Sequence, residues 1–195
     1  FSPDGEILET PGEATDAIQA QNIRSRLRLG AYPVIEFNGL VFAYLGPPKE
    51  MPDFPNYDTF SIPGITTRPY RINYNCNWLQ ILDAIMDPIH TSFLHSQISG
   101  VQFSEGLSEI GELEIFERGI QFLGSNTRRV DEHVWVRVNE LILPNFTQAG
   151  AAFAADGTKT RLFGRSSFTR WVVPVDDTHS MSLAWGNFGE RGDPF

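Results

Sequence analysis

The chain has 195 residues, of which 41% are apolar and 20% are charged, and its formal net charge at pH 7 is -9. A chain of this length and composition can bury a folded core, which argues against a disordered protein, and no apolar run reaches the roughly 20 residues that cross a membrane. Because lysines and arginines are scattered and outnumbered by acids, the sequence also argues against a nucleic-acid partner.

The cysteine content predicts the compartment of the protein, and the two ends of the chain predict that it is part of a longer one. Cys76 is the only cysteine, so no disulfide can form within the chain, which predicts a reducing compartment, the cytoplasm. The first residues, Phe1-Ser-Pro-Asp-Gly, have the character of a strand and a turn rather than of a signal peptide, and residues 190–195 follow a strand. We therefore expect both ends to lie within a longer protein.

The first third of the chain predicts a small β-rich part. Residues 17–29 are weakly periodic and form either a short helix or a loop. Asn38-Gly39 stands between two β-rich runs within residues 33–46, which is the strongest short-range signal for a hairpin. Four prolines in residues 47–55 then favour an extended linker, because proline fixes φ and lacks a backbone donor, and we place a boundary there.

The rest of the chain predicts one helix and a series of strands. The apolar recurrence in residues 78–86 is that of a helix, and beyond about Gly111 the pattern changes to the period of two that is typical of strands. The predicted strands are residues 70–75, 112–116, 120–123, 134–143, 160–173 and 180–188. Sequential strands with short turns indicate an antiparallel meander. A helix packed on such a sheet gives an α+β domain that can enclose a pocket.

Residues 87–95, Asp-Pro-Ile-His-Thr-Ser-Phe-Leu-His, combine an aspartate and two histidines in an apolar run. On one ideal helix His90 would lie about 60° from Asp87, whereas His95 would lie about 140° from His90. Histidines at this spacing bind one metal ion only where the helix unwinds or contains a π-type turn. Pro88 either starts a new helix or kinks the old one, and both alternatives would re-aim the histidines.

Asp87 adds weight to the interpretation of this run as a metal site. Its carboxylate, one turn before His90, can accept a ring N–H, fix the tautomer and raise the basicity of the ring. Histidines on apolar helices are nevertheless more often core or surface residues than ligands. Spacing alone therefore leaves both interpretations open.

Asn77-Trp78, Asp87, His90 and His95 together form the pattern Asp-x-x-His-x-x-x-x-His behind an Asn-Trp helix start. This pattern resembles the mononuclear iron motif of Rieske-type non-haem ring-hydroxylating oxygenases. The flanking segments agree with the resemblance. Residues 1–11 are similar to the segment after the second Cys-x-x-His of that family's cluster domain, residues 32–48 to its last hairpin, and residues 171–179 to a strand and turn of the phthalate dioxygenase-like branch.

The resemblance implies a fold class and a division of the chain. Residues 59–195 would be the N-terminal part of an α+β helix-grip catalytic domain, in which an antiparallel sheet wraps around a long helix. Residues 1–46 would be the C-terminal part of a β-rich Rieske [2Fe-2S] domain. Residues 47–58 would be the Pro-rich linker between them.

The resemblance also implies site residues and cofactors. His90 and His95 would be ligands of mononuclear Fe(II), and Asp87 would be the carboxylate that links the iron to the cluster of the neighbouring subunit. Asp83 would have a supporting role. The third iron ligand would be an Asp beyond Phe195, and the [2Fe-2S] cluster would lie upstream of Phe1, since it needs two Cys and two His.

The function that the resemblance implies is that of a terminal oxygenase component. The whole protein would use Fe(II) and dioxygen to hydroxylate an aromatic or cyclic organic substrate. It would form a homotrimer and would receive electrons from a separate reductase. Direct nicotinamide binding is not expected, because no Gly-x-Gly-x-x-Gly loop follows a predicted strand.

Several other residues are weaker candidates. Acids in turns are expected to be solvated or turn-forming, and these are Asp156, Asp176 and Asp177. His133 and His179 are expected to be exposed. Some alternate strand residues are expected to line the pocket, and the candidates are Leu141, Leu143, Phe153, Phe163 and Trp185.

Two other functions stay open on the sequence. One is a non-catalytic helix-grip module that binds an apolar small molecule, with His90 and His95 as polar wall residues. The other is a fragment that serves subunit association, with residues 47–55 on an interface.

Overall fold

The computed structural model describes residues 1–12, 18–95, 105–150 and 166–189. The contacts divide the chain into two compact units, Phe1–Pro55 and Asn56–Phe195. This division falls inside the stretch that the sequence predicts to be a linker. The assignment of the two units to the two implied domains stays a prediction.

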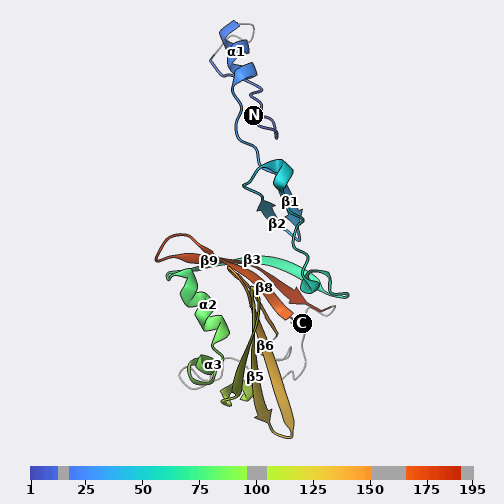
Figure 1. Ribbon diagram of the computed structural model, residues 1–195, viewed down its shortest axis with the longest axis vertical. Coiled ribbons are helices and arrows are strands. Elements are labelled where there is room, and N and C mark those ends of the chain that lie inside the picture. The colour runs from blue at the N-terminus through green and yellow to red at the C-terminus, as the bar shows by residue number, and fades with distance from the viewer. Residues whose placement is uncertain (13–17, 96–104, 151–165, 190–195) are drawn as a thin grey trace. The chain divides into compact units, whose positions relative to one another are not determined.

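The first unit contains the helix α1 (Ile18–Arg26) and a hairpin of β1 (Val34–Phe37) and β2 (Leu40–Ala43) (Figure 1). Asn38 and Gly39 have φ angles of 48° and 78°, and two successive positive φ angles are typical of the type I′ hairpin turn. The hairpin prediction is therefore confirmed. Of the two alternatives for the preceding segment, the helix is observed.

The proline-rich stretch, residues 47–55, contains one short 3-10 helix, η1 (Pro48–Glu50). A second, η2 (Asp58–Ser61), follows the stretch. Phe54 packs on the hairpin of the first unit, with ring centroids 5.4 Å from Phe37 and 4.8 Å from Phe42. The end of the stretch is thus part of the first unit's small aromatic core.

The second unit is built on a seven-stranded sheet in the order β3-β9-β8-β7-β6-β5-β4. Its strands are β3 (Thr66–Tyr74), β4 (Glu112–Arg118), β5 (Gln121–Val130), β6 (His133–Ile142), β7 (Phe146–Gly150), β8 (Ser166–Pro174) and β9 (Ser180–Phe188). All pairs are antiparallel, and from β4 to β9 each strand pairs with the next along the chain. The predicted meander and the α+β class are confirmed.

Several strands differ from the prediction. β3 begins at Thr66, four residues before the predicted start at Tyr70, and β4 ends at Arg118, two residues after the predicted end. β7 was not predicted, because its sequence Phe-Thr-Gln-Ala-Gly is short and largely polar, and its pairing with β8 shifts register between Ala149 and Gly150. β5 continues seven residues beyond the predicted end at Leu123, as far as Val130, through a polar run that lacks an apolar alternation. The first part of the predicted strand 160–173 lies outside the described residues.

The helices α2 (Trp78–Met86) and α3 (Ile89–Phe93) lie on one side of this sheet (Figure 1). α2 contacts β6 and β8, and its Leu82 and Ile85 are buried together with Val172. The helix predicted at residues 78–86 is thus confirmed as α2, and a second short helix, α3, follows it. None of the helices among the described residues is long and apolar enough to cross a membrane.

An aromatic cluster packs on the opposite face of the sheet. Adjacent residues of a strand point to opposite faces, so Trp171 faces away from the side on which Val172 meets α2. The ring centroid of Trp185 lies 5.2 Å from that of Trp171 and 4.9 Å from that of Phe60. Trp185 therefore belongs to this second layer of the core, and the expectation that it lines a pocket beneath the helix is wrong.

Candidate functional site

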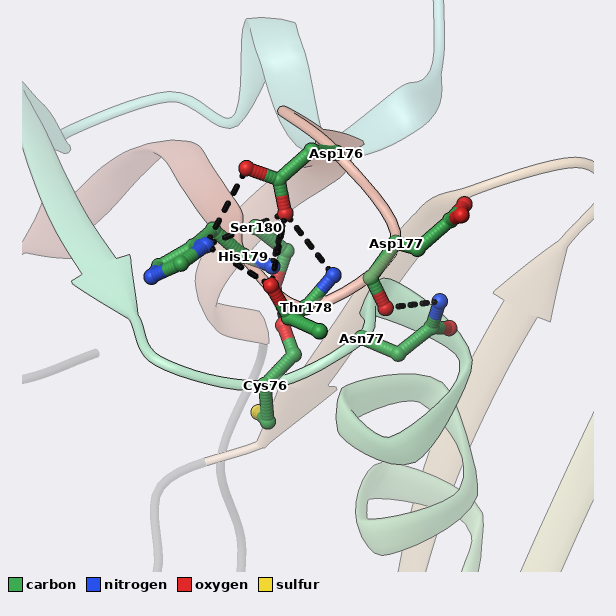
Figure 2. A network of polar contacts seen from close by, with 7 residues as sticks. All are labelled: Cys76, Asn77, Asp176, Asp177, Thr178, His179 and Ser180. Carbon is green, nitrogen blue, oxygen red and sulfur yellow. Dashed lines mark hydrogen bonds and ion pairs between the residues drawn. The ribbon is translucent and has the colours of Figure 1, made fainter.

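The start of α2 is tied to the turn between β8 and β9. The side chain of Asn77 caps the helix by accepting a hydrogen bond from the Leu79 amide (2.9 Å), and its amide group donates to the Asp177 carbonyl (3.0 Å; Figure 2). The Ser180 hydroxyl donates to the Cys76 carbonyl at 3.0 Å. The helix that leads to the histidines is thus anchored by its N-cap residue, Asn77, and by the residue before it.

The turn itself is organised by the Asp176 carboxylate (Figure 2). It accepts hydrogen bonds from the amides of Thr178 and His179, each at 2.8 Å, and one oxygen lies 3.0 Å from Nδ1 of the His179 ring. The Thr178 amide, followed by the His179 side chain, lowers the pKa of Asp176 to about 2. Asp176, Asp177 and His179 are exposed, as predicted for turn residues.

The helix breaks at Asp87. α2 ends at Met86, Asp87 adopts an extended conformation (φ -94°, ψ 102°), and Pro88 precedes the first residue of α3. One oxygen of the Asp87 carboxylate accepts a hydrogen bond from the Ile89 amide at 2.8 Å. Pro88 therefore starts a new helix rather than kinking the old one, and the Asp87 side chain satisfies an amide in its first turn.

The new helix brings His90 and His95 together. Leu94 and His95 have π-helical conformation, which widens the turn between the two histidines. Their ring centroids lie 5.4 Å apart, and the ring planes make an angle of 68°. The π-type turn that the five-residue separation of the two histidines predicts is thus present.

The His90 ring contacts the backbone carbonyl of Asp87 more closely than the Asp87 carboxylate that the sequence suggested. Its Nδ1 lies 2.5 Å from the Asp87 carbonyl oxygen but 3.7 Å from the nearer carboxylate oxygen of Asp87. Because a carbonyl oxygen can only accept, Nδ1 of a neutral His90 carries the hydrogen and Nε2 keeps its lone pair. The backbone of Asp87, more than its carboxylate, therefore sets the tautomer that a metal ligand requires.

Arg128 of β5 holds the helix break in place, and sequence reasoning missed it. This side chain is 3% exposed, and its guanidinium donates to the Pro88 carbonyl (3.4 Å), the Thr91 hydroxyl (3.3 Å) and the Glu109 carbonyl (2.7 Å). Asn139 of β6 likewise donates to the Ile85 carbonyl near the end of α2, at 2.7 Å. The sequence signal that could have revealed Arg128 and Asn139 is the alternation of polar residues along their strands. Such residues are normally assigned to the face of the sheet that contacts solvent.

Both histidines line one cavity of about 740 Å³ between the helices and the sheet. Its walls include apolar side chains such as Ile72, Ile81 and Phe168, and the guanidinium-bearing residues Arg137 and Arg170. Of the expected wall residues, Leu141 packs instead under α2, and Leu143 follows the end of β6 with 43% of its surface exposed. Phe153 and Phe163 lie outside the described residues.

Comparison with known proteins tests the resemblance seen in the sequence. No family model matches the chain. The chain is 34% identical over 209 aligned residues to the oxygenase subunit of tert-butanol monooxygenase / tert-amyl alcohol desaturase from Aquincola tertiaricarbonis, an alignment that covers 100% of this chain and 43% of that subunit. The resemblance of the chain to Rieske-type oxygenases is confirmed.

Two further matches agree with the family and with the fold. The α subunit of phenoxybenzoate dioxygenase from Ectopseudomonas oleovorans is 29% identical over 195 residues, which covers 92% of this chain and 45% of that subunit. Dicamba monooxygenase bound to dicamba has a similar fold, with a TM-score of 0.67 at 14% identity over 94% of this chain and 55% of that one. The chain thus spans less than half the length of these two curated relatives.

The distance between His90 and His95 fits the mononuclear iron that Rieske-type oxygenases use. Two imidazoles that share an ion through ring nitrogens have centroids roughly 4.5 to 6 Å apart, because each nitrogen binds at about 2 Å. His90 and His95 meet this requirement at 5.4 Å. In the described part of the chain no third His, Cys, Asp or Glu joins them. A single cysteine cannot hold a Rieske cluster, so the ligands of that cofactor are not in these residues.

The other acids and histidines singled out in the sequence do not join the pair within the part of the chain that the structure describes. Asp83 is exposed on α2, and it contributes its carbonyl, which accepts the Asp87 amide at 3.0 Å, rather than its carboxylate. His133 is exposed at the start of β6, as predicted. Asp156 lies outside the described residues.

Proposed function

We propose that this chain supplies two iron ligands, His90 and His95, to a terminal oxygenase that hydroxylates an aromatic or cyclic organic substrate with dioxygen. The observation that carries the proposal is the convergence of the two imidazoles, 5.4 Å apart, at the wall of one cavity. A site of two histidines and one carboxylate leaves positions on ferrous iron open for dioxygen, and that is the chemistry the bound metal would supply.

The chain's own residues would prepare this site. The Asp87 carbonyl holds the Nδ1 hydrogen of His90 and leaves Nε2 as the ligand atom. The Asp87 carboxylate, 46% exposed, caps α3 and would also be the acidic link to a cluster in a neighbouring subunit. The apolar walls of the cavity would hold the organic substrate close to the histidines and keep water out.

The larger assembly follows from the family and belongs to the same proposal. Residues 1–46 would complete a Rieske domain, residues 47–58 would link it, and residues 59–195 would begin the catalytic domain. A separate reductase would deliver electrons to a homotrimer in the cytoplasm. The names of the relatives include both a monooxygenase and a dioxygenase, so one or two oxygen atoms would be transferred.

Iron analysis of the full-length protein tests the proposal. We expect close to one mononuclear iron per chain in addition to the cluster iron, and loss of that one iron in His90→Ala and in His95→Ala. His133→Ala is the matched control, because His133 is exposed on β6 away from the cavity. Unchanged iron in the first two variants would refute the assignment, and a wild-type protein without mononuclear iron would leave a binding pocket and no oxygenase.

A further inference from the structure

A second cavity, of about 470 Å³, lies on the face of the sheet that is turned away from the histidines. Its lining comes from four neighbouring strands, β4 to β7, and from the start of η2. Adjacent residues of a strand point to opposite faces, so Glu140 in this lining faces away from Asn139, which lines the cavity of the histidines. The sheet therefore separates the two cavities.

The Glu140 carboxylate is fixed in this second cavity by two neutral amides. One of its oxygens accepts a hydrogen bond from the side-chain amide of Gln121, and the other accepts from that of Gln148. The side-chain oxygen of Gln148 in turn accepts from the Thr59 hydroxyl at 2.9 Å. Each carboxylate oxygen can accept a further hydrogen bond, so Glu140 is both held in position and open to a ligand.

The two amides satisfy hydrogen bonds of Glu140 but not its charge. Among the ion pairs of the described residues, none includes Glu140. Arg118 lines the same cavity, but it comes from β4 across the intervening β5, and its side chain is exposed. Asp58, also exposed, adds a second carboxylate to the lining. A half-buried carboxylate without a counter-charge is costly to the folded protein, and a cationic ligand would remove that cost.

Tyr57 forms a wall of the cavity near this carboxylate. Its ring stacks on that of Phe146, with centroids 4.4 Å apart and an angle of 22° between the planes. Burial, followed by the negative charge of Glu140, raises the pKa of Tyr57, so its hydroxyl keeps the hydrogen at neutral pH. Ile142, which is buried, and Ile120 add aliphatic surface. The cavity therefore combines a fixed negative charge with room for an apolar body.

We propose that this cavity binds a small organic ammonium ion, with its N–H groups on the Glu140 carboxylate and its apolar body against Tyr57 and Ile142. An ammonium group supplies a positive charge and several donors, which together complete the environment of the carboxylate. An organic acid fits less well, because the lining has two carboxylates and one exposed guanidinium. The proposal is independent of the oxygenase chemistry, since His90 and His95 line the other cavity.

Equilibrium binding to the full-length protein tests the inference. Cyclohexylammonium is compared with cyclohexanol by calorimetry at neutral pH, because the two molecules differ mainly in charge. We expect the ammonium ion to bind about 10-fold more tightly than the alcohol, near the lower end of the range for hydrogen bonds to a charged group, since part of the lining is exposed. Equal binding of the two, or no binding of the ammonium ion, would overturn the proposal.

Two variants assign the preference to this cavity. Glu140→Gln keeps the shape of the side chain and removes its charge, so it is expected to abolish most of the preference. Glu132→Gln makes the same change in the exposed turn between β5 and β6 and is the matched control. If Glu140→Gln does not fold, Ile120→Lys places a positive charge at an exposed position of the lining and is expected to weaken binding of the ammonium ion alone. An undiminished preference in the folded variant would contradict the assignment.

A third variant separates this site from the iron site. An amine can also bind to iron, and His90→Ala is expected to lack the mononuclear iron. We expect His90→Ala to keep the full preference for the ammonium ion, because His90 lies on the other side of the sheet. A preference that disappears in this variant would place the ligand on iron and overturn the proposal. Loss of the ammonium site alone would leave the oxygenase proposal standing.

Discussion

The guanidinium of Arg128 donates a hydrogen bond to the carbonyl of Pro88, 3.4 Å away, across 40 residues of sequence. Pro88 starts α3, so this contact ties the sheet to the point at which the chain changes direction before His90. The same guanidinium lies 5.6 Å from the centre of the Trp135 ring. The geometry of the histidine pair therefore depends on a side chain that touches neither histidine in the contacts above.

Replacing Arg128 by methionine tests this dependence. Arg128→Met keeps an apolar stem but removes one donor from each of the Pro88 and Glu109 carbonyls. These carbonyls still accept from the hydroxyls of Thr91 and Ser92, so we expect the free energy of unfolding to fall by about 1–3 kcal/mol. Urea denaturation of the full-length protein measures the loss. Arg129→Met, at the next and exposed position, is expected to change stability by about 0.5 kcal/mol or less. Equal effects of the two substitutions would show that the buried contacts contribute nothing.

The two roles of Asp87 can be separated by substitution. Asp87→Ala removes both the cap of the Ile89 amide and the charge, whereas Asp87→Asn retains a capping oxygen. We expect both variants to keep most of their mononuclear iron, because the Asp87 carbonyl that orients His90 is unchanged. Product formation is expected to fall sharply in both if the charge couples electron arrival to iron. Recovery of full activity in Asp87→Asn would reduce Asp87 to a helix cap.

Asn77 offers a test of the helix anchor. Asn77→Ala removes the cap at the Leu79 amide and the donation to the Asp177 carbonyl, and it is expected to cost about 1 kcal/mol of stability. Asn77→Asp keeps an oxygen for the cap but loses the donor, so its cost is expected to be smaller. Thermal unfolding of the full-length protein ranks the two variants. If Asn77→Asp were the less stable variant, the hydrogen bond to the Asp177 carbonyl, rather than the helix cap, would be the main contribution of Asn77 to stability.

The β8–β9 turn has a predicted dependence on pH. The pKa of Asp176 is lowered from 3.8 to about 2 in the folded protein, so its ionised form stabilises the fold above the unfolded pKa. That contribution is lost as pH falls from about 4 to about 2. An NMR titration in which the Asp176 carboxyl resonance has a midpoint near pH 2 would confirm the shift. Asp176→Asn is expected to be less stable than the wild type above about pH 4, and the difference should disappear at about pH 2. A midpoint near the ordinary value would contradict the hydrogen bonds of the turn.

Much of the fold was readable from the chain. The hairpin around Asn38-Gly39 was predicted because its turn requires two positive φ angles. The helix Trp78–Met86 was predicted because its apolar residues recur at helical spacing. β7 was missed because a short strand without alternation has no local signal, and its pairing with β6 and β8 defines it.

Some residues of the candidate site were likewise predicted from local sequence, and others were found only in the tertiary structure. Local order along the chain was enough to mark Asp87, His90 and His95 as a possible iron motif and to require a widened turn between the histidines. It left open whether Pro88 kinks a helix or starts one, and it gave no reason to single out Arg128, Arg137, Asn139 or Arg170. Those side chains come from separate strands, and their roles depend on which face of a twisted sheet is buried and on what lies opposite. Periodicity reports the chain's own neighbours, whereas a pocket is made by residues that meet only after the strands have paired.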